Sequence, residues 1–185
     1  MDARDVFRRA ARDKGVATAM IEKWVHLARP QLAFVRDEGP VIGRFGGKPS
    51  MPDGAEWPDF MACMATIDLA LVPRGSHDLD LPQDGQLIFF AETMDIPEYC
   101  NVVYVPAGVP VTERELPDDA ILDDVITPFP LCGRPRWSMP QGASDLTVEL
   151  DDSWEILEPI YDALGDLTDG KYPFAMGGHG AMPFR

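Results

Sequence analysis

Cysteine and histidine are scarce in this chain of 185 residues. The three cysteines lie more than thirty residues apart and form no C-x-x-C pair, which argues against a disulfide framework: Cys63, Cys100 and Cys132. The three histidines form no pair at metal-ligand spacing either: His26, His77 and His179. We therefore expect reduced, partly buried thiols, no bound metal and no other cofactor.

Long hydrophobic runs are also missing. No apolar run approaches the roughly twenty residues that a membrane helix needs. The first fifteen residues, MDARDVFRRAARDKG, are charged throughout and lack the apolar core of a secretory signal, and their acidic residues disfavour a transit peptide. These absences predict a cytoplasmic protein. A hydrophobic fraction of 45% over this length predicts a single domain that buries its core without disulfides.

Positively charged residues are also scarce. Sixteen lysines and arginines face 31 aspartates and glutamates, which gives a net charge of −15. Residues 1–50 carry +4 and residues 51–185 carry −19. Such an acidic body repels nucleic acid and anionic membranes and attracts a basic protein. The simpler interpretation is that the charge serves solubility.

The apolar periodicity predicts helices near both ends of the chain. A helix over residues 3–14 begins at the N-cap Asp2 and ends at Gly15, and a second over residues 18–29 ends at Pro30. A late helix over residues 152–164 begins with a capping box, and Pro159 inside it predicts a kink or a late start.

Strands outnumber these helices. Runs rich in β-branched and apolar residues predict strands at 31–36, 60–71, 85–92 and 100–106, with weaker signals at 123–131 and 145–150. Residues 43–58 and the tail 169–185 are predicted to be loops because they are rich in glycine and proline. The predicted class is α+β, mostly antiparallel, with N-terminal helices and one late helix.

The sequence GRFGGKPSMPDGAEWP, residues 43–58, superficially resembles a phosphate loop. A Walker A motif ending at Gly47-Lys48 needs glycine at position 42 and serine or threonine at 49, where this chain has Ile42 and Pro49. Lys48 is kept as a candidate anion ligand. His179, in the sequence GGHG, is a candidate base or ligand; its structural alternative is a hydrogen bond to a loop carbonyl. No G-x-S-x-G nucleophile elbow is present.

Several of these motifs occur together in a fixed order: RFGGKPSMPDGAEWP, ATIDLALV, LPQDGQLIFFAE, VVYVP and YPFAMGGHG. In this order they resemble the YwqG-like family of unknown function, closely over residues 40–106 and loosely elsewhere. The matching residues, mainly structural, are Phe45, Gly46, Gly47, Pro49, Pro52, Gly54, Trp57, Pro58, Asp68, Leu69, Gly85, Phe89, Phe90, Gly177, Gly178 and His179.

The resemblance implies one α+β domain built from a duplicated strand-rich unit. Residues 1–30 then form helices, 31–110 a first unit and 111–185 a second. In related proteins the GGH segment leads into further strands, so the resemblance implies a second unit that is short, rearranged or incomplete here. It implies no catalytic residues. It also implies an immunity-like role beside bacterial toxins, in which an acidic protein occludes a basic toxin.

Two functional hypotheses follow. The first is a noncatalytic acidic module that binds a basic protein, of unknown oligomeric state, with aspartate pairs as its binding surface: Asp118, Asp119, Asp123, Asp124, Asp151 and Asp152. These pairs lack the EF-hand pattern that would favour calcium. The second is an enzyme or small-ligand binder with a pocket near the 45–58 loop and His179.

Overall fold

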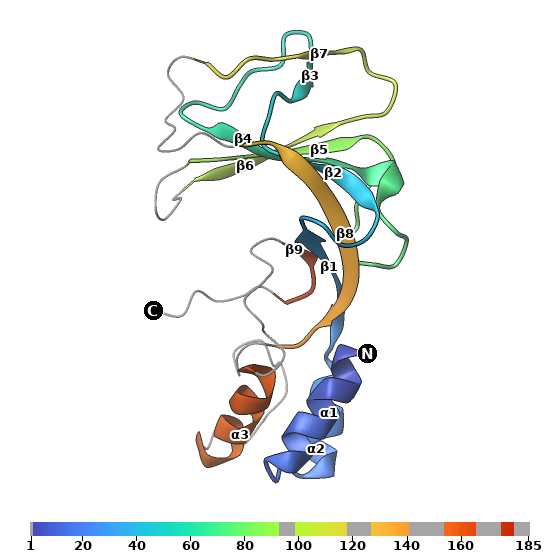
Figure 1. The fold of residues 1–185 in the computed structure, drawn as a ribbon, viewed down its shortest axis with the longest axis vertical. Coiled ribbons are helices and arrows are strands. Elements are labelled where there is room, and N and C mark those ends of the chain that lie inside the picture. Colours follow the sequence, from blue (N-terminus) through green and yellow to red (C-terminus); the bar gives the residue numbers. More distant parts are fainter. Residues whose placement is uncertain (1, 93–98, 118–126, 141–153, 166–174, 180–185) are drawn as a thin grey trace. The chain divides into compact units, whose positions relative to one another are not determined.

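The computed structural model describes residues 2–92, 99–117, 127–140, 154–165 and 175–179 (Figure 1). The helices are α1 (Ala3–Asp13), α2 (Thr18–His26), the 3-10 helix η1 (Leu69–Leu71) and α3 (Trp154–Gly165). The strands are β1 (Arg29–Val35), β2 (Val41–Phe45), β3 (Ser50–Pro52), β4 (Ala62–Asp68), β5 (Gln86–Ala91), β6 (Cys100–Val105), β7 (Val111–Glu113), β8 (Phe129–Ser138) and β9 (Ala175–Gly177). In these ranges no helix is long and apolar enough to cross a membrane.

Seven strands form one sheet in the order β6-β5-β4-β2-β8-β1-β9, and β3 pairs with β7 in a second, two-stranded sheet. The pairs β4/β5, β5/β6, β2/β4, β2/β8, β1/β9 and β3/β7 are all antiparallel. The predicted class is confirmed, since the protein is α+β, strand-rich and antiparallel, with N-terminal helices and one late helix. The duplication that the family resemblance implies stays a prediction.

The chain forms two compact units, each made of segments that are not contiguous in sequence. Unit 1 comprises Met1–Phe34, Pro73–Leu79 and Arg134–Arg185. Unit 2 comprises Val35–Val72 and Asp80–Gly133.

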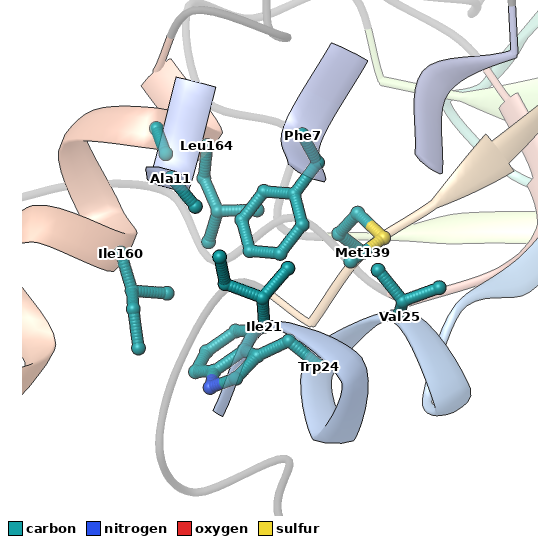
Figure 2. Close-up of a cluster of buried hydrophobic side chains, with 9 residues drawn as sticks. Phe7, Ala11, Ile21, Trp24, Val25, Met139, Ile160 and Leu164 are labelled. Atoms are coloured by element: carbon teal, nitrogen blue, oxygen red, sulfur yellow. The ribbon is translucent and has the colours of Figure 1, made fainter. Parts of the chain in front are cut away.

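The core of unit 1 joins its three helices. Apolar residues at helical spacing place one buried face on each helix. Figure 2 shows Phe7 among side chains from all three helices and from Met139, which follows β8. The buried cluster is Phe7, Ala11, Ile21, Trp24, Val25, Met139, Ile160, Ala163 and Leu164. As predicted, α1 begins at Asp2, whose carboxylate accepts a hydrogen bond from the Arg4 main-chain N–H at 2.9 Å.

The core of unit 2 lies on one face of β4, β5 and β6. Its buried residues are Met51, Cys63, Ile88, Phe90 and Val105. In β5 and β6 these side chains alternate with others on the opposite face, as the two-residue period of a strand requires. The strands predicted at 60–71, 85–92 and 100–106 correspond to β4 with η1, β5 and β6.

Several predicted boundaries are wrong. Helix α2 ends at His26 rather than 29, because β1 already begins at Arg29, two residues before the predicted strand. The predicted loop 43–58 contains the end of β2 and all of β3, and the predicted loop 169–185 contains β9. These strands are short, and their pairing with distant segments leaves little local signal.

Predictions near the ends of the described ranges have mixed outcomes. Of the strand predicted at 123–131, residues 129–131 belong to β8, which continues to Ser138. The strand predicted at 145–150, and the capping box before α3, lie outside the described residues. Helix α3 starts at Trp154 and includes Pro159.

Replacing Phe7 with alanine tests the three-helix core. Phe7 is fully buried, so its truncation leaves a cavity and should cost about 3–5 kcal/mol of stability. The measurement is urea unfolding, monitored by the circular dichroism signal of the helices. The control is Arg9→Ala on the exposed side of the same helix, which should change stability by less than about 0.5 kcal/mol. Equal losses in the two variants would show that α1 does not pack as described.

Candidate functional site

The 45–58 loop of unit 2 is held by its backbone. Gly46, Gly47 and Gly54 have φ angles of +63°, +82° and +78°, a region that other residues rarely adopt. The Gly46 N–H donates to the Met64 carbonyl at 2.7 Å, which fixes the loop to β4. The glycine pair therefore serves a sharp turn.

Prolines and a tryptophan complete this scaffold. Pro49 is fully buried, and the carbonyls of Pro52 and Pro58 accept turn hydrogen bonds from the main chains of Ala55 and Met61. The Trp57 indole donates to the Met61 carbonyl at 2.8 Å, and its ring meets that of Phe90 edge to face at 5.1 Å between centroids. The loop is thereby clamped to the core of unit 2.

Lys48, the candidate anion ligand, already has an anionic partner. Its ammonium group forms an ion pair with the carboxylate of Glu115, and this hydrogen bond raises the pKa of Lys48. Its carbonyl accepts a hydrogen bond from the Arg44 guanidinium. A bound phosphate would have to displace Glu115, so the arrangement favours loop fixation.

The second group of motif residues joins the end of β4 to the start of β5. The Asp68 carboxylate caps η1 by accepting from the Ala70 N–H at 3.0 Å, and the Leu69 N–H donates to the Gly85 carbonyl at 2.9 Å. Gly85 has φ +83°, and a Cβ there would lie 2.5 Å from the Val105 carbonyl oxygen. Phe90 packs into the core, and the adjacent Phe89 on the other face is half-buried.

His179 belongs to unit 1, where the GGH segment ends β9. Its ring Nε2 lies 2.8 Å from the Leu27 carbonyl oxygen, so Nε2 donates there. Its main-chain N–H donates to the Ser138 hydroxyl at 3.1 Å. Among the described residues, this hydroxyl hydrogen-bonds to the His179 main chain and not to its ring, which is not the arrangement of a nucleophile and its base.

The two glycines of this segment fit closely against neighbours that the sequence did not single out. The Gly178 N–H donates to the Asp78 carboxylate at 2.8 Å, and the Gln31 side chain donates to the Gly177 carbonyl at 3.0 Å. Arg136 in turn donates to the Gln31 side-chain oxygen at 2.7 Å. These partners lie some forty to 150 residues from the motif, and only the folded chain brings them together.

An open hollow of about 470 Å³ lies in unit 1, lined by Arg4, Arg8, Glu22, Val25, His26, Ala28 and Trp137. Its arginines are paired. Arg4 binds Asp2 and stacks over the Trp137 ring at 3.9 Å, and Arg8 binds both Asp5 and Glu22. The hollow therefore offers little uncompensated positive charge to an anion.

The remaining candidates are the six paired aspartates at 118–119, 123–124 and 151–152, which lie outside the described residues. Within the described ranges, no group of three or more His, Cys, Asp or Glu side chains comes together as a metal site. The 45–58 loop belongs to unit 2 and His179 belongs to unit 1.

The net charge of the chain belongs almost entirely to unit 2. Its segments carry four lysines and arginines against 17 aspartates and glutamates, a net charge of −13 out of −15. Its described residues alone carry four against eleven. Unit 1 is nearly balanced, with twelve against fourteen. Acidity is thus a property of one compact unit.

The fold and these motifs define a strand-rich α+β domain with glycine-dependent turns. The profile of the family described as a domain of unknown function (DUF1963) matches residues 43–164, about two thirds of the chain, and the protein belongs to this family. No curated protein and no solved structure matches the chain.

Substitution of Gly178 with alanine tests the docking of the GGH segment. Its φ is +75°, and a Cβ would lie 2.6 Å from the Ser138 Cβ, so the variant should lose about 3 kcal/mol of stability in denaturant unfolding. The matched control in unit 1 is Gly75→Ala, where φ is +73° and nothing lies within 4 Å. This control should lose only about 1 kcal/mol of stability, the cost of a left-handed backbone conformation at an alanine. Equal losses at the two positions would contradict the close approach.

The Arg8–Glu22 pair between α1 and α2 predicts a pH dependence. The hydrogen bond from Arg8 lowers the pKa of Glu22, so the pair stabilises the fold above the usual titration range of a glutamate. That stabilisation is lost as pH falls through the lowered pKa. The midpoint of urea unfolding should therefore differ between the wild type and Glu22→Gln at pH 7, and the difference should vanish near about pH 2. A difference that persists there would contradict the pairing.

Proposed function

We propose that this protein is a noncatalytic binding module whose acidic unit 2 binds a basic protein partner. The observation that carries the proposal is the net charge of −13 on this one unit. A field of one sign attracts an oppositely charged partner and speeds its encounter. If acidity served solubility alone, nothing would favour its concentration in one unit over the other.

The side chains that a catalytic alternative would use support this choice. Lys48 forms an ion pair with Glu115, and the ring of His179 donates a hydrogen bond to the Leu27 carbonyl. Each interaction fixes a loop. An enzyme or small-ligand binder built on these residues would have to break them first.

From the order of its motifs, we propose that the chain is a YwqG-like member of DUF1963. We further propose an immunity-like role in which the partner is a basic bacterial toxin. The three cysteines are all free thiols, which suits a reducing cytoplasm. The proposal requires neither nucleic acid nor membrane, because an acidic unit repels both.

The test is affinity capture from the native host at low salt, followed by mass spectrometry. We expect one basic protein, bound in stoichiometric amount. The acidic surface is tested by a triple variant, Asp80→Asn, Asp84→Asn and Glu92→Gln, which should weaken binding of that purified partner by about tenfold. Within the described part of the chain these side chains form no ion pair, so the fold should survive.

The matched control removes the same charge from unit 1 through Asp13→Asn, Glu158→Gln and Asp162→Asn. The last change breaks a 3.9 Å surface ion pair with Lys14, which contributes little to stability. It should bind within about threefold of wild type, because these charges lie outside the acidic unit. Capture of an acidic partner, or equal weakening by both triple variants, would contradict the proposal.

A further inference from the structure

Strand β6 forms one edge of the seven-stranded sheet. One side of β6 pairs with β5 along its whole length, without a bulge, from Ala91 opposite Cys100 to Gln86 opposite Val105. Among the described residues no strand pairs with its other side. Figure 1 shows β6 running beside β5.

The backbone groups on that free side can be assigned. The Glu92 N–H donates to the Tyr99 carbonyl, so the main chain of Tyr99 faces β5. Successive residues of a strand direct these groups to alternate sides. Those of Asn101, Val103 and Val105 therefore face β5 as well. Those of Cys100, Val102 and Tyr104 point away from it.

The side chains of the same three residues are also exposed. Cys100 is solvent-accessible, and the exposed fractions of Val102 and Tyr104 are 50% and 39%. Five of the ten well-exposed large hydrophobic side chains in the described residues lie within residues 99–111. Exposed apolar side chains beside an unpaired strand edge favour an interaction there. The strand, CNVVYV, has no lysine, proline or bulge of the kind that protects sheet edges from pairing.

The charge of the chain around β6 indicates which kind of segment could pair with its free edge. Residues 80–113, which include β5, β6 and β7, contain six aspartates and glutamates and no lysine or arginine. A second copy of this chain would bring another unit of net charge −13 to the same edge, and the two would repel. An extended segment rich in lysine or arginine meets no such repulsion.

We propose that the free edge of β6 binds an extended basic segment of the partner by strand addition. The inference rests on the proposed function and specifies its contact. Main-chain hydrogen bonds to Cys100, Val102 and Tyr104 supply the pairing, and the acidic surroundings select basic side chains.

The probe is a blocked octapeptide of four Lys-Val repeats, added to the full-length protein under reducing conditions because the Cys100 thiol is exposed. Amide hydrogen exchange is followed by NMR. We expect slower exchange at Val102 and Tyr104, with little change at Val103 and Val105, whose amides already face β5. A peptide of the same sequence with every backbone nitrogen methylated keeps the charge and should give no protection. Four Glu-Val repeats should not bind.

The matched variants are Val102→Pro and Val102→Thr. Proline removes an N–H that faces away from β5, so it breaks no bond of the existing ladder. It should weaken peptide binding by about tenfold, and threonine, which is also β-branched, by less than about threefold.

Three results would overturn the proposal. The first is no binding of the Lys-Val peptide. The second is peptide binding that the triple acidic variant weakens but Val102→Pro leaves unchanged. The acidic unit would then bind basic chains without strand addition, and the proposed function would stand. The third is protection of β6 without peptide that rises with protein concentration, which would identify a second copy as the occupant.

Discussion

Mutual repulsion among carboxylates is the constraint on which unit 2 depends. Seventeen acidic side chains share it with four cations, and its fold must hold against their repulsion. The cations contribute mainly to loop anchoring. Arg36 lies over the Phe129 ring, Arg44 binds the Lys48 carbonyl and Arg114 binds the Ala55 carbonyl. They fix the chain and leave most of the negative charge available to a partner.

The residues that resembled a catalytic or phosphate site also fix the chain in place. The glycines of the 45–58 loop supply turns, Trp57 clamps the loop to the core, and Lys48 ties it to Glu115. In unit 1 the GGH segment closes β9 onto β1 and the end of β8. These motifs therefore serve the turns and the strand pairing of the backbone.

Local chemistry explains which parts of the fold were predictable. Asp2 as the N-cap of α1, and the strands β5 and β6, follow from residues adjacent in sequence. Strand β9 and the pairing of β2 with β8 depend on partners far away in the chain, for which sequence patterns carry no signal. For the same reason Gln31, Asp78 and Ser138 could not be foreseen as neighbours of the GGH segment.

The sequence showed that residues 51–185 carry −19, but not that the net charge lies almost entirely in unit 2, because that unit is assembled from two separate segments. We infer that this concentration of negative charge speeds the encounter with a basic partner. Stopped-flow association between the protein and its captured partner, across a range of ionic strength, tests it most directly. We expect the association rate to fall steeply as salt rises, while the dissociation rate changes little. An association rate independent of salt would contradict it.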